Sequence, residues 1–298
     1  MTLRSSTPSN ARPESRRPAE QPHPVTGPAP AHAAPPPLLG PGDPPPFTVL
    51  NPDSSSPVLF LCDHACRAVP KALGDLGLTE EEMCRHIAYD IGAAPLTKLL
   101  AARFGATAVL SGYSRLIVDP NRNLDDPTAI PVVSDDVLIP ANRALDTQEV
   151  RRRVEAIFDP YHEAIAAQVA VRRARGQVPA IVSIHSFTPV MRGVARPWHV
   201  GILWDRDPRI PVPLMERLRA DPRWCVGDNE PYSGRTTTGG TIETHATPAG
   251  LPNVLIEVRQ DLIAVPEGGA LWAQVLGDAL EPILADPNLY RVELYPRE

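Results

Sequence analysis

The chain has 298 residues, 43% of them hydrophobic, which is enough to bury the core of one large domain or two small ones. A formal charge of -6 and a pI near 5.8 argue against nucleic acid or an anionic membrane as the main partner, and favour a small soluble substrate. No apolar run approaches the roughly 18 to 20 residues of a membrane span, and no secretory signal is recognisable, so a cytoplasmic protein is predicted. The oligomeric state is left open.

The composition changes near residue 47. Residues 1–46 hold 14 of the 37 prolines and no aromatic residue. Such a segment buries too little apolar surface to offset the entropy of ordering it, so a disordered Pro-rich tail is predicted for 1–46. Residues 47–298 are expected to form a single catalytic domain.

From Phe47 onward, short apolar runs alternate with longer segments of helical period, which is the pattern of an α/β domain. Most runs are continuous rather than alternating, as expected where helices cover both faces of a mostly parallel sheet. We predict strands at 57–62, 107–111, 115–118, 179–185, 199–204 and 253–258. Predicted helices are 79–104, which starts with a capping box and is kinked or divided at Pro95; 146–176, bent at Pro160; and 268–284.

The cysteines are few and match no disulfide framework or paired CxxC spacing. They are Cys62, Cys66, Cys84 and Cys225. We therefore predict reduced thiols, with Cys62 and Cys66 serving as small packing residues and not as metal ligands.

Four predicted strands end in polar residues, at 63–64, 119–122, 185–186 and 257–261. In an open α/β sheet, ligands bind outside the carboxyl ends of the strands, so these residues are expected to converge on one crevice. Each alone has an ordinary explanation, such as a structural histidine or a turn. Together they favour a metal-dependent hydrolase over a chance concentration of buried polar groups.

Imidazole and carboxylate ligands favour zinc, and His64 and His185 supply two of the three ligands that a catalytic zinc needs. The third ligand stays open at this point among Asp63, Asp90 and Glu243. An HxxE pair would need an acid at position 67, where the chain has arginine. Asp90 is expected on the 79–104 helix, with His86 four residues earlier as a ligand partner or as the group that orients Asp90.

Five motifs, in their order and spacing, resemble the N-formylglutamate amidohydrolases over roughly residues 50 to 285. The motifs are CDHA (62–65), HIAYDIGA (86–93), SRLIVDPNR (114–122), IHSFTP (184–189) and IEVRQDLI (256–263). This family is related to the zinc carboxypeptidases and the aspartoacylase-type amidohydrolases. The resemblance implies a three-layer α/β/α sandwich with a mostly parallel mixed sheet. It also implies one zinc ion held by His64, Asp90 and His185.

Roles for the other polar residues follow from the chemistry of amide hydrolysis. Glu257 is predicted to be the general base, with a salt bridge to Arg259 as the alternative reading. Arg122 is assigned to the oxyanion or to a substrate carboxylate. Arg115, Arg122 and Arg259 are candidates for binding the two carboxylates of the substrate, and Asn121 for positioning its polar backbone-like atoms. The Gly- and Thr-rich stretch 232–253 is expected to form a mobile lid or substrate contact that includes His245.

Two functions are consistent with these residues. The first is a zinc-dependent amidohydrolase that cleaves the N-formyl or another short N-acyl amide of glutamate or a related acidic amino acid, in amino-acid catabolism. The second is a catalytically silent relative that binds an acidic metabolite in a regulatory role. The presence of Glu257 beside the three implied zinc ligands favours the enzyme.

Overall fold

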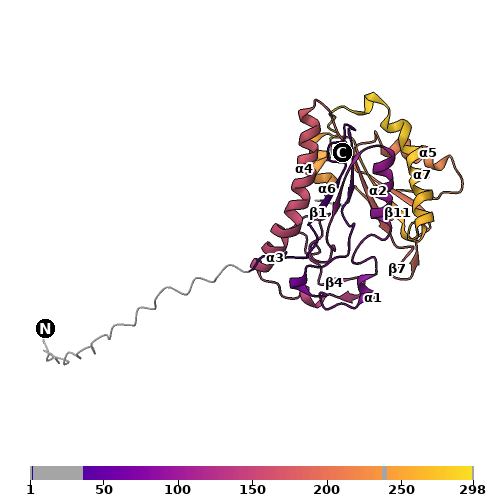
Figure 1. Ribbon diagram of the computed structural model, residues 1–298. Coiled ribbons are helices and arrows are strands. Elements are labelled where there is room, and N and C mark those ends of the chain that lie inside the picture. Colours follow the sequence, from indigo (N-terminus) through magenta and orange to yellow (C-terminus); the bar gives the residue numbers. More distant parts are fainter. Residues whose placement is uncertain (1, 3–35, 237–239, 297–298) are drawn as a thin grey trace. The chain divides into compact units, whose positions relative to one another are not determined.

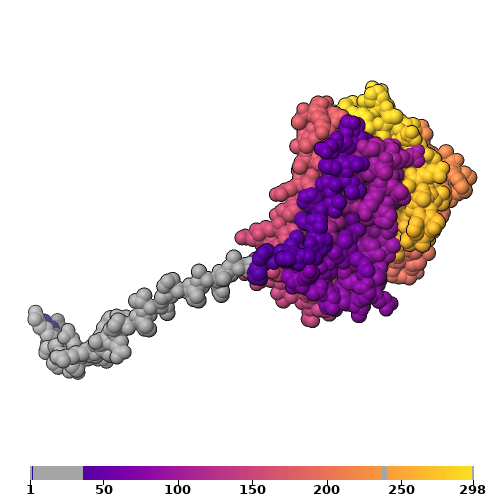
Figure 2. Space-filling view, viewed as in Figure 1, coloured from indigo at the N-terminus to yellow at the C-terminus, as the bar shows by residue number. Residues whose placement is uncertain are grey.

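The computed structural model describes residues 2, 36–236 and 240–296. The chain divides into two units, Met1–Pro36 and Pro37–Glu298, and nearly all of the first lies outside the described residues. The predicted tail therefore falls partly outside them. Residues 37–46 differ from the prediction, because Leu38 is only 2% exposed within a core cluster and the Tyr113 hydroxyl donates to the Pro44 carbonyl. In Figure 2 the indigo segment after residue 36 runs over the visible face of the domain.

The second unit is built on a seven-stranded sheet with the strand order β1-β3-β2-β6-β11-β9-β10. Four of the six strand pairs are parallel, and the pairs β1/β3 and β9/β11 are antiparallel. The strands are β1 (Phe47–Leu50), β2 (Val58–Cys62), β3 (Thr107–Ser111), β6 (Ala180–Phe187), β9 (Val200–Leu203), β10 (Val226–Asp228) and β11 (Asn253–Arg259). The mostly parallel mixed sheet agrees with the predicted fold class. Two small hairpins lie outside it, β4 (Val133–Ser134) with β5 (Val137–Leu138) and β7 (Val190–Met191) with β8 (Val194–Ala195).

Helices cover both faces of the sheet, with α4 on one side and α2 and α7 on the other (Figure 1). The helices are α1 (Glu80–Met83), α2 (Ala93–Arg103), α3 (Thr147–Arg153), α4 (Asp159–Ala174), α5 (Pro211–Arg219), α6 (Thr241–His245) and α7 (Pro266–Leu284). The strands are buried on both faces: alternate residues of β2 enter the core under α2 and α7 and the core under α4 and α6. None of the helices in the described part of the chain has the length and hydropathy that crossing a membrane requires.

The predicted helix 79–104 is two helices separated by a run of turns. Thr79 forms the expected capping box with Glu82, but α1 ends at Met83. The second helix, α2, starts after Gly92, whose φ of +81° no continuous helix allows. Pro95 causes no kink, because it lies in the first turn of α2, where a backbone N–H has no partner within the helix.

The predicted strand 115–118 is also wrong, since these residues form turns after β3. Leu116, Ile117 and Val118 are fully buried, but they belong to a separate core cluster that includes Leu76 and Met83. A short continuous apolar run does not distinguish a strand from a buried irregular segment.

The predicted helix 146–176 forms as α3, a π-helical turn at Val154–Phe158 and α4. Asp146 caps its start by accepting from the Glu149 N–H, and Gly176 follows its end with a φ of +75°. The π turn ends two residues before Pro160, whose missing N–H and ring disrupt the regular α-helical bonding pattern.

Candidate metal centre

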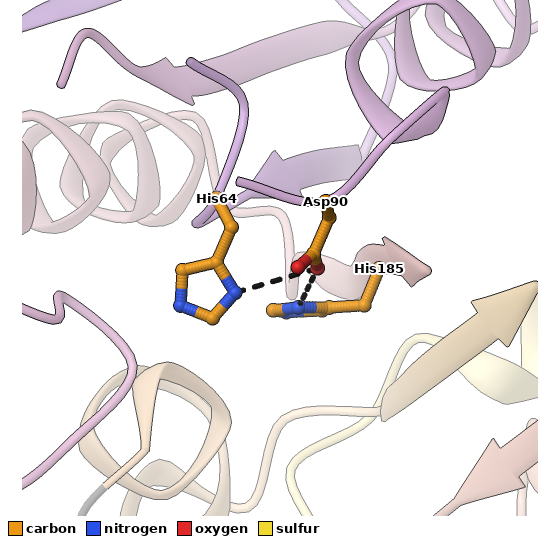
Figure 3. Close-up of side chains that lie close together, drawn as sticks. All are labelled: His64, Asp90 and His185. Atoms are coloured by element: carbon orange, nitrogen blue, oxygen red, sulfur yellow. Dashed lines mark hydrogen bonds and ion pairs between the residues drawn. The ribbon is translucent and has the colours of Figure 1, made fainter. Parts of the chain in front are cut away.

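Three buried side chains from distant parts of the sequence meet at the carboxyl edge of the sheet (Figure 3). His64 follows β2, Asp90 lies in the turns before α2, and His185 lies within β6. The Nδ1 atoms of His64 and His185 lie 3.3 and 2.8 Å from the same oxygen, Oδ2 of Asp90. The backbone supports this arrangement, because the Asp90 N–H donates to the His64 carbonyl. The three ligand atoms lie within 4.8 Å of one another, so this group could hold a metal ion.

The other nitrogen of each histidine faces a second buried carboxylate. Nε2 of His64 lies 2.7 Å from Oδ1 of Asp119, and Nε2 of His185 lies 2.8 Å from Oδ2 of Asp63. An ionised carboxylate only accepts hydrogen bonds, so both Nε2 atoms carry hydrogen. Both Nδ1 atoms face Asp90 Oδ2, so without a metal they can carry protons as well; a metal ion that replaced these protons would bind the two Nδ1 lone pairs, in the carboxylate–histidine–metal arrangement common to metalloproteins.

Asp63 is fully buried and holds several elements together. Its Oδ1 accepts from the hydroxyls of Tyr161 in α4 and Thr241 in α6, and its Oδ2 accepts from Ser183 as well as from His185. With these partners it positions His185 from the side away from Nδ1. Among the three candidates for the third ligand, Asp90 is therefore the one whose carboxylate joins both histidines.

Charge explains how the cluster is balanced. Burial alone would raise the pKa values of Asp63, Asp90 and Asp119, but hydrogen bonds and charges from the histidines and a neighbouring guanidinium lower them below their usual range. Burial would lower the pKa values of His64 and His185, yet the carboxylates raise that of His64 and raise that of His185 well above its usual value.

These donors fit a divalent cation. Three carboxylates and one guanidinium leave two negative charges, which two protons on the histidines or one divalent ion balance equally. Two ligands that bind one zinc ion tetrahedrally at about 2.0 to 2.2 Å are roughly 3.3 to 3.6 Å apart. The 3.3 Å between His64 Nδ1 and Asp90 Oδ2 lies in this range, whereas the 2.8 Å between His185 Nδ1 and the same oxygen is a hydrogen-bond distance that would have to lengthen when a metal binds.

Glu257 lies beside this group on β11. It pairs in parallel register with His185 on β6, so the two side chains project from the same face of the sheet. Its Oε2 is buried and has no hydrogen-bond partner among the described residues. Burial raises the pKa of Glu257 to about 7, and the charge of Asp90 adds to the effect. A buried carboxylate with an unused oxygen and a pKa near neutrality is suited to accept a proton.

Two of the predicted substrate-binding arginines lie near the ligands. Arg115 binds Asp119 through Nε and Nη2 at 3.0 and 2.6 Å, and its Nη1 lies 3.2 Å from His64 Nδ1 and 3.6 Å from Asp90 Oδ1. Arg122 is 39% exposed and pairs more loosely, at 3.2 Å from Asp126 and 3.5 Å from Asp119. Asn121 donates its N–H to Asp119 and accepts from the Thr241 N–H.

Other predicted residues have different surroundings. Arg259 pairs with Asp261 at 2.8 Å and not with Glu257. His245 lies 2.8 Å from Nδ1 of His162, which in turn donates from Nε2 to the Pro120 carbonyl. Glu243 lies on α6 and lines a neighbouring cavity, outside the group that could hold a metal.

His86 is not on a helix with Asp90, because the chain forms turns between them. Its Nε2 lies 3.5 Å from Asp135. His86 therefore does not orient Asp90. Instead, His185 Nδ1 and the Ser186 N–H contact Asp90 Oδ2, at 2.8 and 3.2 Å.

Three features of the site were not predicted. Asp119 orients His64, although the sequence indicated only that polar residues follow a strand at 119–122 and assigned Asn121 and Arg122 to the substrate. Tyr232 also lies within electrostatic reach of Glu257: burial and the charge of Glu257 raise the pKa of Tyr232, and Arg196 donates to the Tyr232 hydroxyl at 3.0 Å. No spacing pattern marks this pair. The 232–253 stretch that contains Tyr232 is partly helical, as α6, with 237–239 outside the described residues.

The cysteines take no part in this group. All four are free, and burial raises the pKa of the Cys62 thiol well above its usual value, which disfavours a thiolate ligand.

Comparisons with known proteins agree with this geometry. The chain matches the model of the N-formylglutamate amidohydrolase family over residues 56–264. Among solved structures, the gene product Atu2144 from Agrobacterium tumefaciens is 36% identical, with a TM-score of 0.79, covering 83% of this chain and 99% of that protein. N-formylglutamate amidohydrolase from Ralstonia eutropha JMP134 is 20% identical, with a TM-score of 0.60, covering 80% of this chain and 97% of that one, and supports the fold. No curated protein matches the chain.

Proposed function

Because the chain belongs to the N-formylglutamate amidohydrolase family, we propose that it is a zinc-dependent enzyme that cleaves the N-formyl or another short N-acyl amide of glutamate or a related amino acid. The observation that carries this proposal is the meeting of His64 Nδ1, Asp90 and His185 Nδ1 beside the buried carboxylate of Glu257. These groups are what hydrolysis of an amide by water requires: a Lewis-acid site and a base next to it.

His64, Asp90 and His185 would hold the zinc ion, and Asp119 and Asp63 keep the two imidazoles in the required tautomer. A zinc ion in such a site lowers the pKa of water and polarises a carbonyl group. Glu257 takes a proton from the attacking water at Oε2 and then delivers it to the leaving amine.

Two arginines are given different roles toward the substrate. Arg115 lies nearest to the ligands, so it is better placed than Arg122 to stabilise the negative charge that develops on the carbonyl oxygen. Arg122 is more exposed and, with Asn121, is assigned to a carboxylate of the amino acid. Substrate contacts are also proposed for Arg259, for His245 and for the rest of the 232–253 stretch around it.

The test combines metal analysis with formate release from N-formyl-L-glutamate, comparing the wild type with Glu257→Gln. We expect one zinc per chain in both proteins and formate release by the wild type alone. Zinc bound by both, with no hydrolysis of any N-acyl amino acid by the wild type, would refute the enzymatic function and favour the silent metabolite-binding protein.

A further inference from the structure

A cavity lies beside the candidate metal centre, on the face of the sheet that carries Glu257. Its floor is formed by Leu203 of β9 and Leu255 of β11, which are paired in antiparallel register, and Ile242 of α6 and Leu251 add further apolar wall. Trp204 and Tyr295 also line it. We call it the β9–β11 cavity.

Two of its lining residues, Leu255 and Asn121, link the β9–β11 cavity to the site. Leu255 precedes Glu257 by two residues on the same strand, so both side chains project from one face, about 7 Å apart along the strand. Asn121 lines the other end, and its N–H donates to Asp119, the carboxylate that holds His64. A substrate whose amide lies between Glu257 and the histidines therefore has this cavity within reach of its substituents.

Four of the five charged residues that line the cavity are paired with one another or with near neighbours, and the fifth, Glu243, also has a partner. Asp205 pairs with Arg206 at 2.6 Å, Asp207 with Arg209, and Glu293 with Arg291 at 2.8 Å. Among the described lining residues, Arg206 is the one cation, and Asp205 and the Tyr295 carbonyl already accept from it. A carboxylate placed here would lose its hydration without gaining an unpaired partner. An uncharged apolar group has no such hydration to lose and needs no charged partner.

We propose that the β9–β11 cavity buries an apolar group of the substrate, of about five non-hydrogen atoms. The cavity volume is about 70 Å³, and one buried water needs about 10 to 15 Å³ of such space, which gives this size. The group is carried either by the acyl part or by the amino-acid side chain. This inference rests on the proposed function, because it places the amide of an N-acyl amino acid at Glu257.

The experiment compares kcat/KM of the zinc-loaded full-length wild type for three compounds. N-formyl-L-glutamate is the reference, N-hexanoyl-L-glutamate extends the acyl group, and N-formyl-L-norleucine replaces the acidic side chain. Each buried methylene contributes a factor of about four, so one extended compound should exceed the reference at least tenfold. Which of the two does so identifies the source of the apolar group. If both are cleaved no better than N-formyl-L-glutamate, the inference is overturned while the proposed function stands.

A variant that fills the cavity tests its location. In Leu255→Phe, the kcat/KM of the better extended compound, divided by the kcat/KM of N-formyl-L-glutamate, should be at least fivefold lower than in the wild type. Leu99→Phe is the matched control, because Leu99 is 43% exposed on α2, and it should leave the ratio unchanged. An equal ratio in Leu255→Phe and wild type would contradict the inference.

Binding gives an outcome that does not depend on catalysis. Should no compound be cleaved, the proposed function fails, and the three compounds are titrated against the tryptophan fluorescence of wild type and Trp204→Phe. Tighter binding of an extended compound, with a signal that Trp204→Phe lacks, supports the cavity assignment. Equal affinity for all three overturns it.

Discussion

Replacing Asp63 with asparagine is predicted to weaken zinc binding while leaving all three proposed ligands in place. In the wild type, Asp63 Oδ2 accepts from His185 Nε2 at 2.8 Å and from Ser183 Oγ at 3.0 Å. In Asp63→Asn, one amide oxygen can still accept from Tyr161 and Thr241, but the amide nitrogen then faces two donors. The opposite orientation would place the amide nitrogen against the hydroxyls of Tyr161 and Thr241, and both would have to stop donating to residue 63. In the first orientation, His185 relieves the clash by moving its hydrogen to Nδ1, which removes the lone pair that the metal needs.

Loss of an orienting carboxylate of this kind typically lowers metal affinity 10- to 100-fold, which is about 1.4 to 2.7 kcal/mol. The zinc affinity is measured by competition with a chromophoric chelator at pH 7.5. Asp125→Asn is the matched control, because Asp125 is exposed and its loss should change the affinity less than twofold. An affinity of Asp63→Asn within twofold of wild type would refute the claim that Asp63 sets the tautomer of His185.

Three further predictions follow from the structure. Burial raises the pKa of Glu257 to about 7, so kcat/KM should fall as the pH drops below about 7 and the base becomes protonated. A value of kcat/KM that stays constant from pH 8 to 5 would exclude Glu257 as the base. Burial and the charge of His162 lower the pKa of His245 from 6.5 to about 4, so on acidification the unfolded chain protonates His245 before the folded chain does, and the free energy of unfolding falls between about pH 6.5 and 4. His245→Gln should reduce that fall by roughly 1 to 2 kcal/mol in thermal melts across this range, and the same dependence of stability on pH in the variant and the wild type would contradict it. In Gly92→Ala, the new Cβ would lie 2.3 Å from the Ile263 carbonyl oxygen at a φ of +81°, so urea unfolding should show a loss of roughly 2 kcal/mol or more in the free energy of unfolding, together with weaker zinc binding. The control Gly176→Ala, with open space around it, should lose roughly 1 kcal/mol and bind zinc normally.

The strands that carry the chemistry could be predicted because β2, β6 and β11 are buried on both faces and read as continuous apolar runs. His64 and Glu257 follow directly from the ends of such runs. Asp90 was expected among the ligands, but on the wrong element: the helical period continues through 84–92, while the left-handed Gly92 and the bond from the Asp90 N–H to the His64 carbonyl break the helix. The break depends on contacts between segments far apart in sequence, which periodicity does not report.

The orienting carboxylates were missed for a similar reason. Asp119 and His64 are 55 residues apart, and Asp63 and His185 are 122 apart. Only the fold brings each pair together. The same holds for Leu116, Ile117 and Val118, which were predicted as a strand because burial in a second core cluster leaves the same apolar pattern.

The central claim is that His64, Asp90 and His185 hold one zinc ion. Anomalous diffraction at the zinc edge from crystals of the zinc-loaded protein tests it directly. The predicted result is one strong peak at bonding distance, about 2.0 to 2.2 Å, from Nδ1 of His64, a carboxylate oxygen of Asp90 and Nδ1 of His185. A zinc-loaded, folded protein with no peak among these three atoms would contradict it.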